Sequence, residues 1–150
     1  MRSISDRASA RMRTVPASER LVCYVQTVTA DSNAEPFHIH LAGRDGGPLD
    51  CSFEQAESAL QQIQTLYFEP DGSFAFKGPA SGLELFGMVY DAYGAIQYVE
   101  IRGRCDWADW QRLVACFISG GTAPKSAVVK SLPGGELQTL QDFERLTWSV

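Results

Sequence analysis

The sequence predicts a single α+β domain built on an antiparallel sheet. Two turn motifs, Glu69-Pro70-Asp71-Gly72 and Asp91-Ala92-Tyr93-Gly94, each separate two strand-like runs and predict consecutive β-hairpins over residues 66–78 and 83–103. Helical patterns over about 52–64 and 106–118 flank the hairpins, and a short helix is expected near the C-terminus. Helices that stand between blocks of strands, rather than after every strand, favour this class over a doubly wound parallel fold.

The first hairpin has a well-specified register. Pro70 presets φ for a type I turn, and Gly72 accepts the left-handed conformation that closes the turn with a bulge. This turn pairs Phe68 with Phe74 and Leu66 with Phe76, which makes one face apolar and the other face mostly wettable. The turn and the alternation of side chains predict the same register, because a slip of one residue would invert every side chain.

The second hairpin, given the same turn geometry, pairs Tyr90 with Ile96, Met88 with Tyr98, and Phe86 with Glu100. One face then collects the apolar and aromatic side chains of Phe86, Met88, Tyr90, Ile96 and Tyr98. The opposite face is not plainly polar either. A strand pair that is apolar on both sides is either covered on both sides or exposes an apolar patch. Either the 106–118 helix covers this face and the 52–64 helix the other, or another molecule covers it.

The other elements follow from local signals. Residues 20–29 are rich in β-branched and aromatic residues, and residues 37–42 alternate, so both read as strands that pair with each other. Ser52 and Gln55 form a capping box at the start of the first helix, and Asp106 is the N-cap of the second. A short strand within 126–131, an extended piece from Leu137 and a short helix over 140–146 complete the domain.

The composition is that of a globular domain, with 45% hydrophobic and 21% charged residues among 150. We expect a flexible basic N-terminal arm over residues 1–19 and one α+β domain over 20–150. Residues 1–20 carry a charge of +3 and the rest −8, within a total of −5. An acidic body argues against a nucleic-acid or membrane partner.

The four cysteines form no Cys-x-x-Cys pair, and no apolar leader opens the chain, which predicts free thiols and a cytoplasmic location.

Two groups of residues could carry chemistry. His38 and His40 point to the same side of their strand and form a weak candidate for a metal site, although no third ligand follows at a recognisable spacing. The alternative is two solvent-facing polar positions on an edge strand. Cys51 and Cys105 each precede a helix, whose N-terminus can lower a thiol pKa, but only the two histidines could serve as a base. The alternative is that these cysteines are small, half-buried hydrophobic residues.

Two functions remain open. The sequence has no dinucleotide, phosphate-loop, serine-hydrolase or zinc-protease motif, so no cofactor is expected and an enzyme is the less favoured class. The first hypothesis is a protein-interaction or assembly module that uses the aromatic sheet face to bind a protein partner or a second copy as a homodimer. The second is a small-molecule-binding protein or enzyme with a pocket between a curved sheet and its helices. Its first candidate residues are His38, His40, Tyr90, Glu100 and Cys105.

Overall fold

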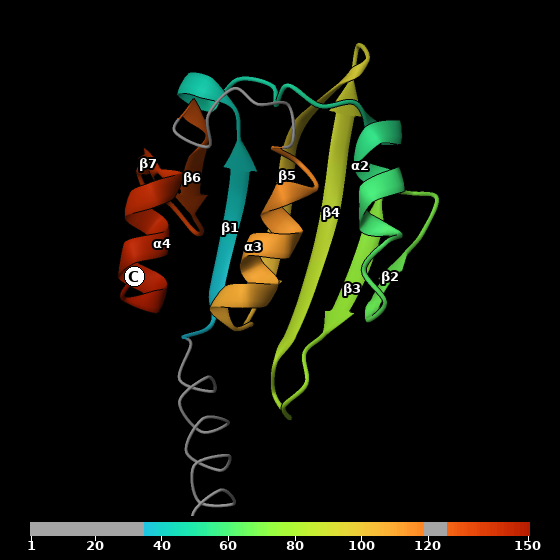
Figure 1. The fold of residues 1–150 in the computed structure, drawn as a ribbon. Coiled ribbons are helices and arrows are strands. Elements are labelled where there is room, and N and C mark those ends of the chain that lie inside the picture. The colour runs from blue at the N-terminus through green and yellow to red at the C-terminus, as the bar shows by residue number, and fades with distance from the viewer. Residues whose placement is uncertain (1–34, 119–125) are drawn as a thin grey trace, which may run out of the picture. The chain divides into compact units, whose positions relative to one another are not determined.

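The computed structural model describes residues 35–118 and 126–150 (Figure 1). The predicted basic arm over 1–19 and the predicted strand over 20–29 lie outside the described residues. The described elements, in chain order, are β1 (Phe37–Ala42), a short 3-10 turn (Arg44–Gly46), α2 (Phe53–Leu60), β2 (Leu66–Phe68), β3 (Ser73–Lys77), β4 (Glu84–Ala92), β5 (Ala95–Gly103), α3 (Trp107–Ala115), β6 (Val128–Ser131), β7 (Leu137–Thr139) and α4 (Leu140–Trp148).

The strands form one antiparallel sheet of seven strands in the order β2-β3-β4-β5-β1-β6-β7. The helices α2, α3 and α4 all lie against one face of this sheet (Figure 1). The domain therefore has two layers, and the α+β class that the sequence predicts is confirmed. The short strand at β6, the extended piece at β7 and the C-terminal helix are also confirmed.

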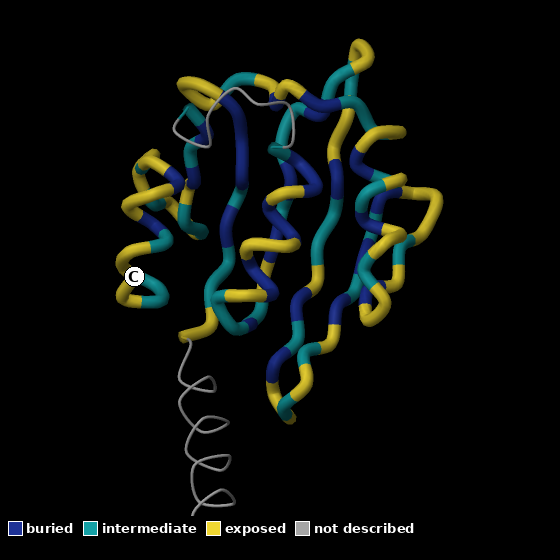
Figure 2. Tube along the Cα trace, viewed as in Figure 1, coloured by how far each residue is buried: buried dark blue, intermediate teal, exposed yellow. Residues whose placement is uncertain are grey.

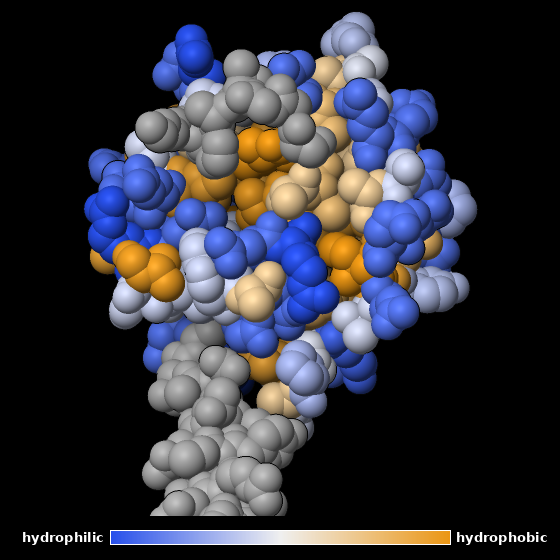
Figure 3. Space-filling model, in the orientation of Figure 1, coloured by the Kyte–Doolittle hydropathy of each residue, from blue (hydrophilic) through white to orange (hydrophobic). Residues whose placement is uncertain are grey.

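The hydrophobic core lies between the sheet and the helices. Alternate strand residues on this face are buried, as Figure 2 shows along the trace, and they meet apolar side chains of the helices. The largest fully buried side chains include Trp110, Phe117, Ile39, Leu41, Leu60, Leu85, Ile96 and Ile101. Figure 3 looks onto the helix layer and shows hydrophilic residues over the outer surface of α2 and apolar residues between the helices. Burial of this one sheet face is the main stabilising contribution.

Both predicted helix starts are confirmed, but both helices are shorter than predicted. The Ser52 hydroxyl accepts a hydrogen bond from the Gln55 amide at 3.2 Å, and the Gln55 side chain accepts one from the Ser52 amide. The Asp106 carboxylate accepts a hydrogen bond from the Asp109 amide at 2.8 Å. Each helix ends early because its last turn tightens: Ile63 donates to the Leu60 carbonyl and Phe117 to the Val114 carbonyl, three residues back in both cases.

The first hairpin has the predicted register. Leu66 lies opposite Phe76 and Phe68 opposite Phe74, and the Glu69 amide donates to the Ser73 carbonyl at 2.9 Å. Gly72 has a φ of 94°, the left-handed conformation that the turn requires. Phe74 and Phe76 are buried against the helix layer. This hairpin therefore gives one face to the core, as predicted.

The predicted register of the second hairpin is wrong. Tyr90 lies opposite Tyr98, and Met88 opposite Glu100. The turn contains two residues, Tyr93 and Gly94, with positive φ values of 55° and 80°, and is not the longer type I turn expected. Gln97 is then an extra residue in β5, because Asp91 pairs with Ile96 and Tyr90 with Tyr98. This β-bulge explains the shift in pairing.

The bulge is held by a side chain that the turn motif alone does not reveal. The Gln97 amide donates to the carbonyl of Ala92 at 2.9 Å and to the carbonyl of Ala95 at 3.2 Å. As a result Ile96 turns to the core face, where its exposed fraction is 0%. The expectation that Ile96 shares a face with Tyr90 and Tyr98 is therefore wrong.

Strand β1 occupies the middle of the sheet. It pairs with β5 along one edge and with β6 along the other. The predicted pairing of residues 37–42 with residues 20–29 involves a segment outside the described residues. The alternation predicted for β1 is confirmed, since Ile39 and Leu41 are fully buried in the core. His38 and His40 point away from the helices and are only partly buried. They therefore stand on a central strand, not on the edge strand that the sequence suggested.

Candidate functional site

The candidate site is the face of the sheet that points away from the helices, which we call the open face. Among residues 35–118 and 126–150, no helix covers it (Figure 1). Strand register places there Tyr67, Glu69, Ser73, Ala75, Lys77, Glu84, Phe86, Met88, Tyr90, Tyr98, Glu100, Arg102, His38, His40 and Lys130. Six strands contribute, so side chains far apart in the sequence form one continuous surface.

Aromatic side chains lie at the centre of the open face. The exposed fraction of Phe86 is 45% and that of Tyr90 is 39%. The Tyr90 and Tyr98 rings stack with centroids 4.5 Å apart, and the His40 ring lies 4.5 Å from Tyr98 on its other side. The Arg102 guanidinium lies 6.0 Å from the centre of the Phe86 ring, within the range of a cation–π contact. These contacts fix the orientation of large side chains that remain open to solvent.

Four of the five residues predicted as an interface lie together. Phe86, Met88 and Tyr90 follow one another along the outer side of β4, and Tyr98 lies beside Tyr90 on β5. Ile96 is absent from this surface because of the bulge at Gln97. The alternative in which the two predicted helices cover opposite faces is wrong, because α2 and α3 both lie on the core side (Figure 1). The core therefore buries only some of the apolar side chains of the second hairpin, and the others remain on the open face.

A polar cluster adjoins the aromatic residues. His38 Nε2 lies 2.7 Å from Glu100 Oε1, and the Tyr90 hydroxyl lies 3.5 Å from Glu100 Oε2. The hydrogen bond from His38 holds the pKa of the Glu100 carboxyl below its usual value, with smaller contributions from the charge of His38, from His40 and from Tyr90. Burial lowers the pKa of His40, and nearby His38 and Lys130 act in the same direction, against Glu100. Glu100 is therefore an ionised acceptor at neutral pH, beside a largely neutral His40.

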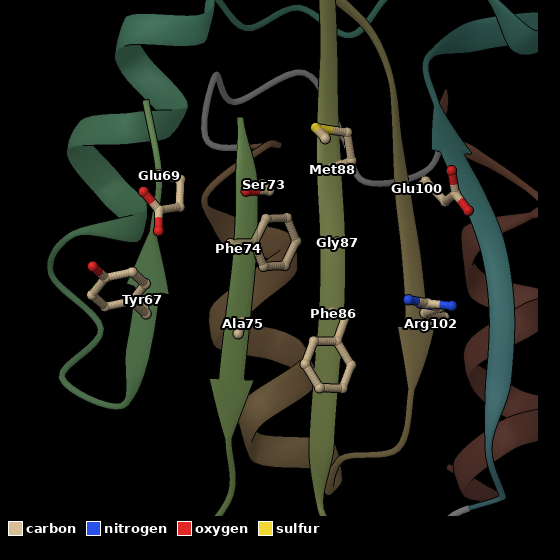
Figure 4. A pocket seen from close by; sticks show the side chains of 10 residues that line it. All are labelled: Tyr67, Glu69, Ser73, Phe74, Ala75, Phe86, Gly87, Met88, Glu100 and Arg102. Carbon is tan, nitrogen blue, oxygen red and sulfur yellow. The ribbon is translucent and has the colours of Figure 1, made fainter. Parts of the chain in front are cut away.

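The open face is hollowed between β2 and β5. The hollow has a volume of about 560 Å³ and is lined by Tyr67, Glu69, Ser73, Phe74, Ala75, Phe86, Gly87, Met88, Glu100 and Arg102. Figure 4 views it from the side opposite the helices, with Tyr67 and Glu69 along one side and Glu100 and Arg102 along the other. Its walls are thus largely aromatic, and both acidic and basic side chains lie at its margins. A protruding side chain or a small polar molecule fits such a depression.

The other predicted candidates are not brought together. No group of three or more histidine, cysteine or acidic side chains is placed to hold a metal ion within the part of the chain that the structure describes. Cys51 and Cys105 are buried, and burial raises the pKa of both thiols, against the lowering expected at helix N-termini. They lie on the core side, whereas both histidines are on the open face. A cysteine–histidine pair is therefore not assembled, and the half-buried thiols of the alternative prediction are in fact fully buried.

Several residues of the site escaped the sequence analysis. Tyr67 and Arg102 belong to the open face, but the sequence did not indicate which faces of the two hairpins lie on the same side of the sheet. Lys130 lies opposite His40 because β6 pairs with β1, a contact between distant parts of the chain. Only the alternation within each strand signals that these side chains point outward. Their grouping depends on the strand order.

Comparison of the chain with protein-family models, with curated proteins and with solved structures gave no match. No described helix combines the length and the apolar character needed to cross a lipid bilayer.

Proposed function

We propose that this protein is a non-enzymatic interaction or assembly module that binds a protein through the open face of its sheet. One observation carries the proposal: Phe86, Met88, Tyr90 and Tyr98 form a continuous apolar and aromatic surface on the side of the sheet opposite the helices. Tyrosine, phenylalanine, methionine and arginine are enriched in the cores of protein interfaces. A contiguous exposed surface of this kind marks an interaction site in a soluble domain.

The open face is also suited to binding by its rigidity. Its aromatic residues stand on the two longest strands, β4 and β5, and their rings are held by stacking and by the cation–π contact of Arg102. Because these side chains are ordered before a partner arrives, binding loses little side-chain entropy. Glu100, His38 and the Tyr90 hydroxyl provide polar groups next to the apolar centre. This mixture gives specificity as well as buried area.

Site-specific photo-crosslinking tests the proposal. A photo-reactive phenylalanine analogue replaces Phe86 in the full chain, and the protein is illuminated in the cells that make it. The matched control places the same analogue at Leu146 on α4, an exposed apolar residue outside the open face. We expect a defined protein adduct from position 86 and none from position 146. Equal labelling at both positions, or no adduct at position 86, would contradict the proposal.

A second candidate function is small-molecule binding in the hollow between β2 and β5. It is supported by the convergence of Glu69, Glu100 and Arg102 around about 560 Å³ of space. A thermal-shift screen of small polar molecules against the wild-type chain and Arg102→Ala tests it. A ligand that stabilises only the wild type would favour this function. If no compound shifts the melting temperature, this candidate is rejected and the proposed interaction function remains.

A further inference from the structure

We infer that the open face binds a second copy of this chain, face to face, about a two-fold axis that runs parallel to the strands between β4 and β5. This inference rests on the proposed function and names its partner. The evidence is the distribution of charge across the open face. One end carries an anionic side chain without an ion pair, and the other end a cationic one.

The charges at the two ends belong to Glu69 and Lys130, whereas Arg102, nearer the centre, lies over the Phe86 ring. Glu69 directly follows β2, and Lys130 lies on β6; both are exposed and neither forms an ion pair within the described parts of the chain. The other acidic residues of this face are engaged, since Glu100 binds His38 and Glu84 binds Lys77. The open face therefore has an acidic end at β2 and a basic end at β6.

Strand register places these two residues at the same height on the sheet. A single cross-strand row contains, in order, Glu69, Ser73, Met88, Glu100, His40 and Lys130. The proposed axis lays β4 over β5, β3 over β1 and β2 over β6 of the other copy. Glu69 then meets the partner subunit's Lys130, and the same contact occurs twice in the dimer. An axis perpendicular to the strands would instead bring like ends together.

The centre of the face is self-complementary under the same operation. Phe86 lies over the partner subunit's Arg102, which extends the contact that these residue types already make within one chain. Tyr90 lies over the partner subunit's Tyr98, next to the existing stack. Met88 lies over the partner subunit's Glu100, whose carboxylate is already bound by His38 of its own chain. The middle of the interface therefore combines aromatic rings, methionine and arginine, which are enriched in protein interfaces, with one ion-paired carboxylate, and opposite charges occupy the rim.

The dimensions of the face are adequate. Strands lie about 4.8 Å apart and rise about 3.3 Å per residue, so the surface from β2 to β6 covers on the order of 600 Å² in projection. Because side chains protrude from the sheet, the accessible area is larger than the projected area and approaches the roughly 800 Å² that each partner buries in a standard interface. Two sheets packed face to face lie about 10 Å apart, a distance that glutamate and lysine side chains can span together. The ion pairs at the rim set the orientation.

Sedimentation equilibrium of the full chain and two charge-reversal variants tests this inference. The wild type is expected to dimerise. Glu69→Lys and Lys130→Glu, each alone, place like charges opposite each other twice and should weaken the dimer about tenfold or more. An equal mixture of the two variants should recover dimerisation, because each contact then joins opposite charges again. Circular dichroism of both variants serves as the control that they are folded.

Each other result overturns the inference. A wild type that stays monomeric at every concentration rules out a second copy. A dimer that is insensitive to the reversals, or that the mixture does not restore, rules out the proposed axis. The adduct at position 86 separates these failures from failure of the proposed function. If that adduct has a mass other than twice the chain, self-association is wrong but the open face still binds a protein.

Discussion

His38 Nε2 lies 2.7 Å from Glu100 Oε1, on a diagonal across the pairing of β1 with β5. The residues directly opposite are His38 with Arg102 and His40 with Glu100, so the carboxylate lies between two imidazoles. Because the hydrogen bond from His38 lowers the Glu100 pKa in the folded chain, the ionised carboxylate contributes stability above its unfolded value, near 4.5. This contribution is lost as the pH falls through the folded-state pKa.

Glu100→Gln should therefore lower the free energy of unfolding at pH 7 by about 0.5–1 kcal/mol, a modest amount because both side chains are partly exposed. The difference from wild type should disappear as the pH falls below about 4.5. Urea denaturation over a pH series measures it. His38→Ala removes the hydrogen bond that is the largest cause of the pKa shift and should give the same loss of pH dependence. A difference that persists at low pH would assign the effect to packing.

Gly87 is expected to tolerate no side chain. A Cβ at this position would collide with the ring of Phe74, which lies directly opposite on β3 and is buried in the core. Gly87→Ala should cost about 1–3 kcal/mol through overpacking. The double variant Gly87→Ala, Phe74→Leu should lose less than the sum of the two single variants, because the smaller side chain vacates the space. Additive losses in denaturation experiments would show that the ring and the glycine are not coupled.

The turn of the second hairpin makes a prediction in the opposite direction. Tyr93 has a φ of 55° and is fully exposed, so it adopts a left-handed conformation without a compensating contact. Tyr93→Asn should stabilise the chain by up to about 1 kcal/mol, since asparagine adopts this conformation more readily. Gly94→Ala is the matched control, because a Cβ at this position meets nothing within 4 Å. The loss of stability expected for this variant therefore comes from the backbone conformation alone. A thermal melt that shows Tyr93→Asn to be destabilising would contradict the account.

Asp109 is a buried acid whose replacement should stabilise the protein. Its Oδ1 pairs with Arg112, but its Oδ2 is buried and has no hydrogen-bond partner among the described residues. Burial is the largest cause that raises the pKa of the Asp109 carboxyl in the folded chain, and the charge of Asp106 is the next. The stability that the protonated carboxyl provides is therefore lost as the pH rises through its folded-state pKa. Asp109→Asn should therefore raise the free energy of unfolding at pH 7, with a gain that shrinks toward pH 3.8. Loss of stability at pH 7 would show that the Arg112 pair outweighs burial.

The fold was predictable where local signals agree. The capping box at Ser52, the N-cap at Asp106 and the turn closed by Gly72 each specify their own element, and the structure has all three. The second hairpin was mispaired because its turn sequence is compatible with two loop lengths. The choice between them depends on Gln97, whose side chain bonds to the turn only once the bulge exists. Local sequence does not report that interaction.

The site was predictable only in part. Alternation along β4 identified Phe86, Met88 and Tyr90, but the position of Ile96 followed the incorrect register. The sequence left open whether α2 and α3 lie on one face of the sheet or on opposite faces, because their apolar stripes are buried against the sheet in either arrangement. Nor could it show that β1 and β6 are adjacent, and this adjacency is what brings Lys130 beside His40. Long-range strand order therefore decides the site, and no local motif encodes it.

Hydroxyl-radical footprinting of the full chain at low and high protein concentration tests most directly whether the open face is covered in an assembly. Tyr90 on the open face and Tyr93 at the hairpin turn are matched reporters of the same residue type, three positions apart. The account predicts that Tyr90 and Met88 become protected as the concentration rises, while Tyr93 stays reactive. Equal oxidation of Tyr90 at both concentrations would contradict it.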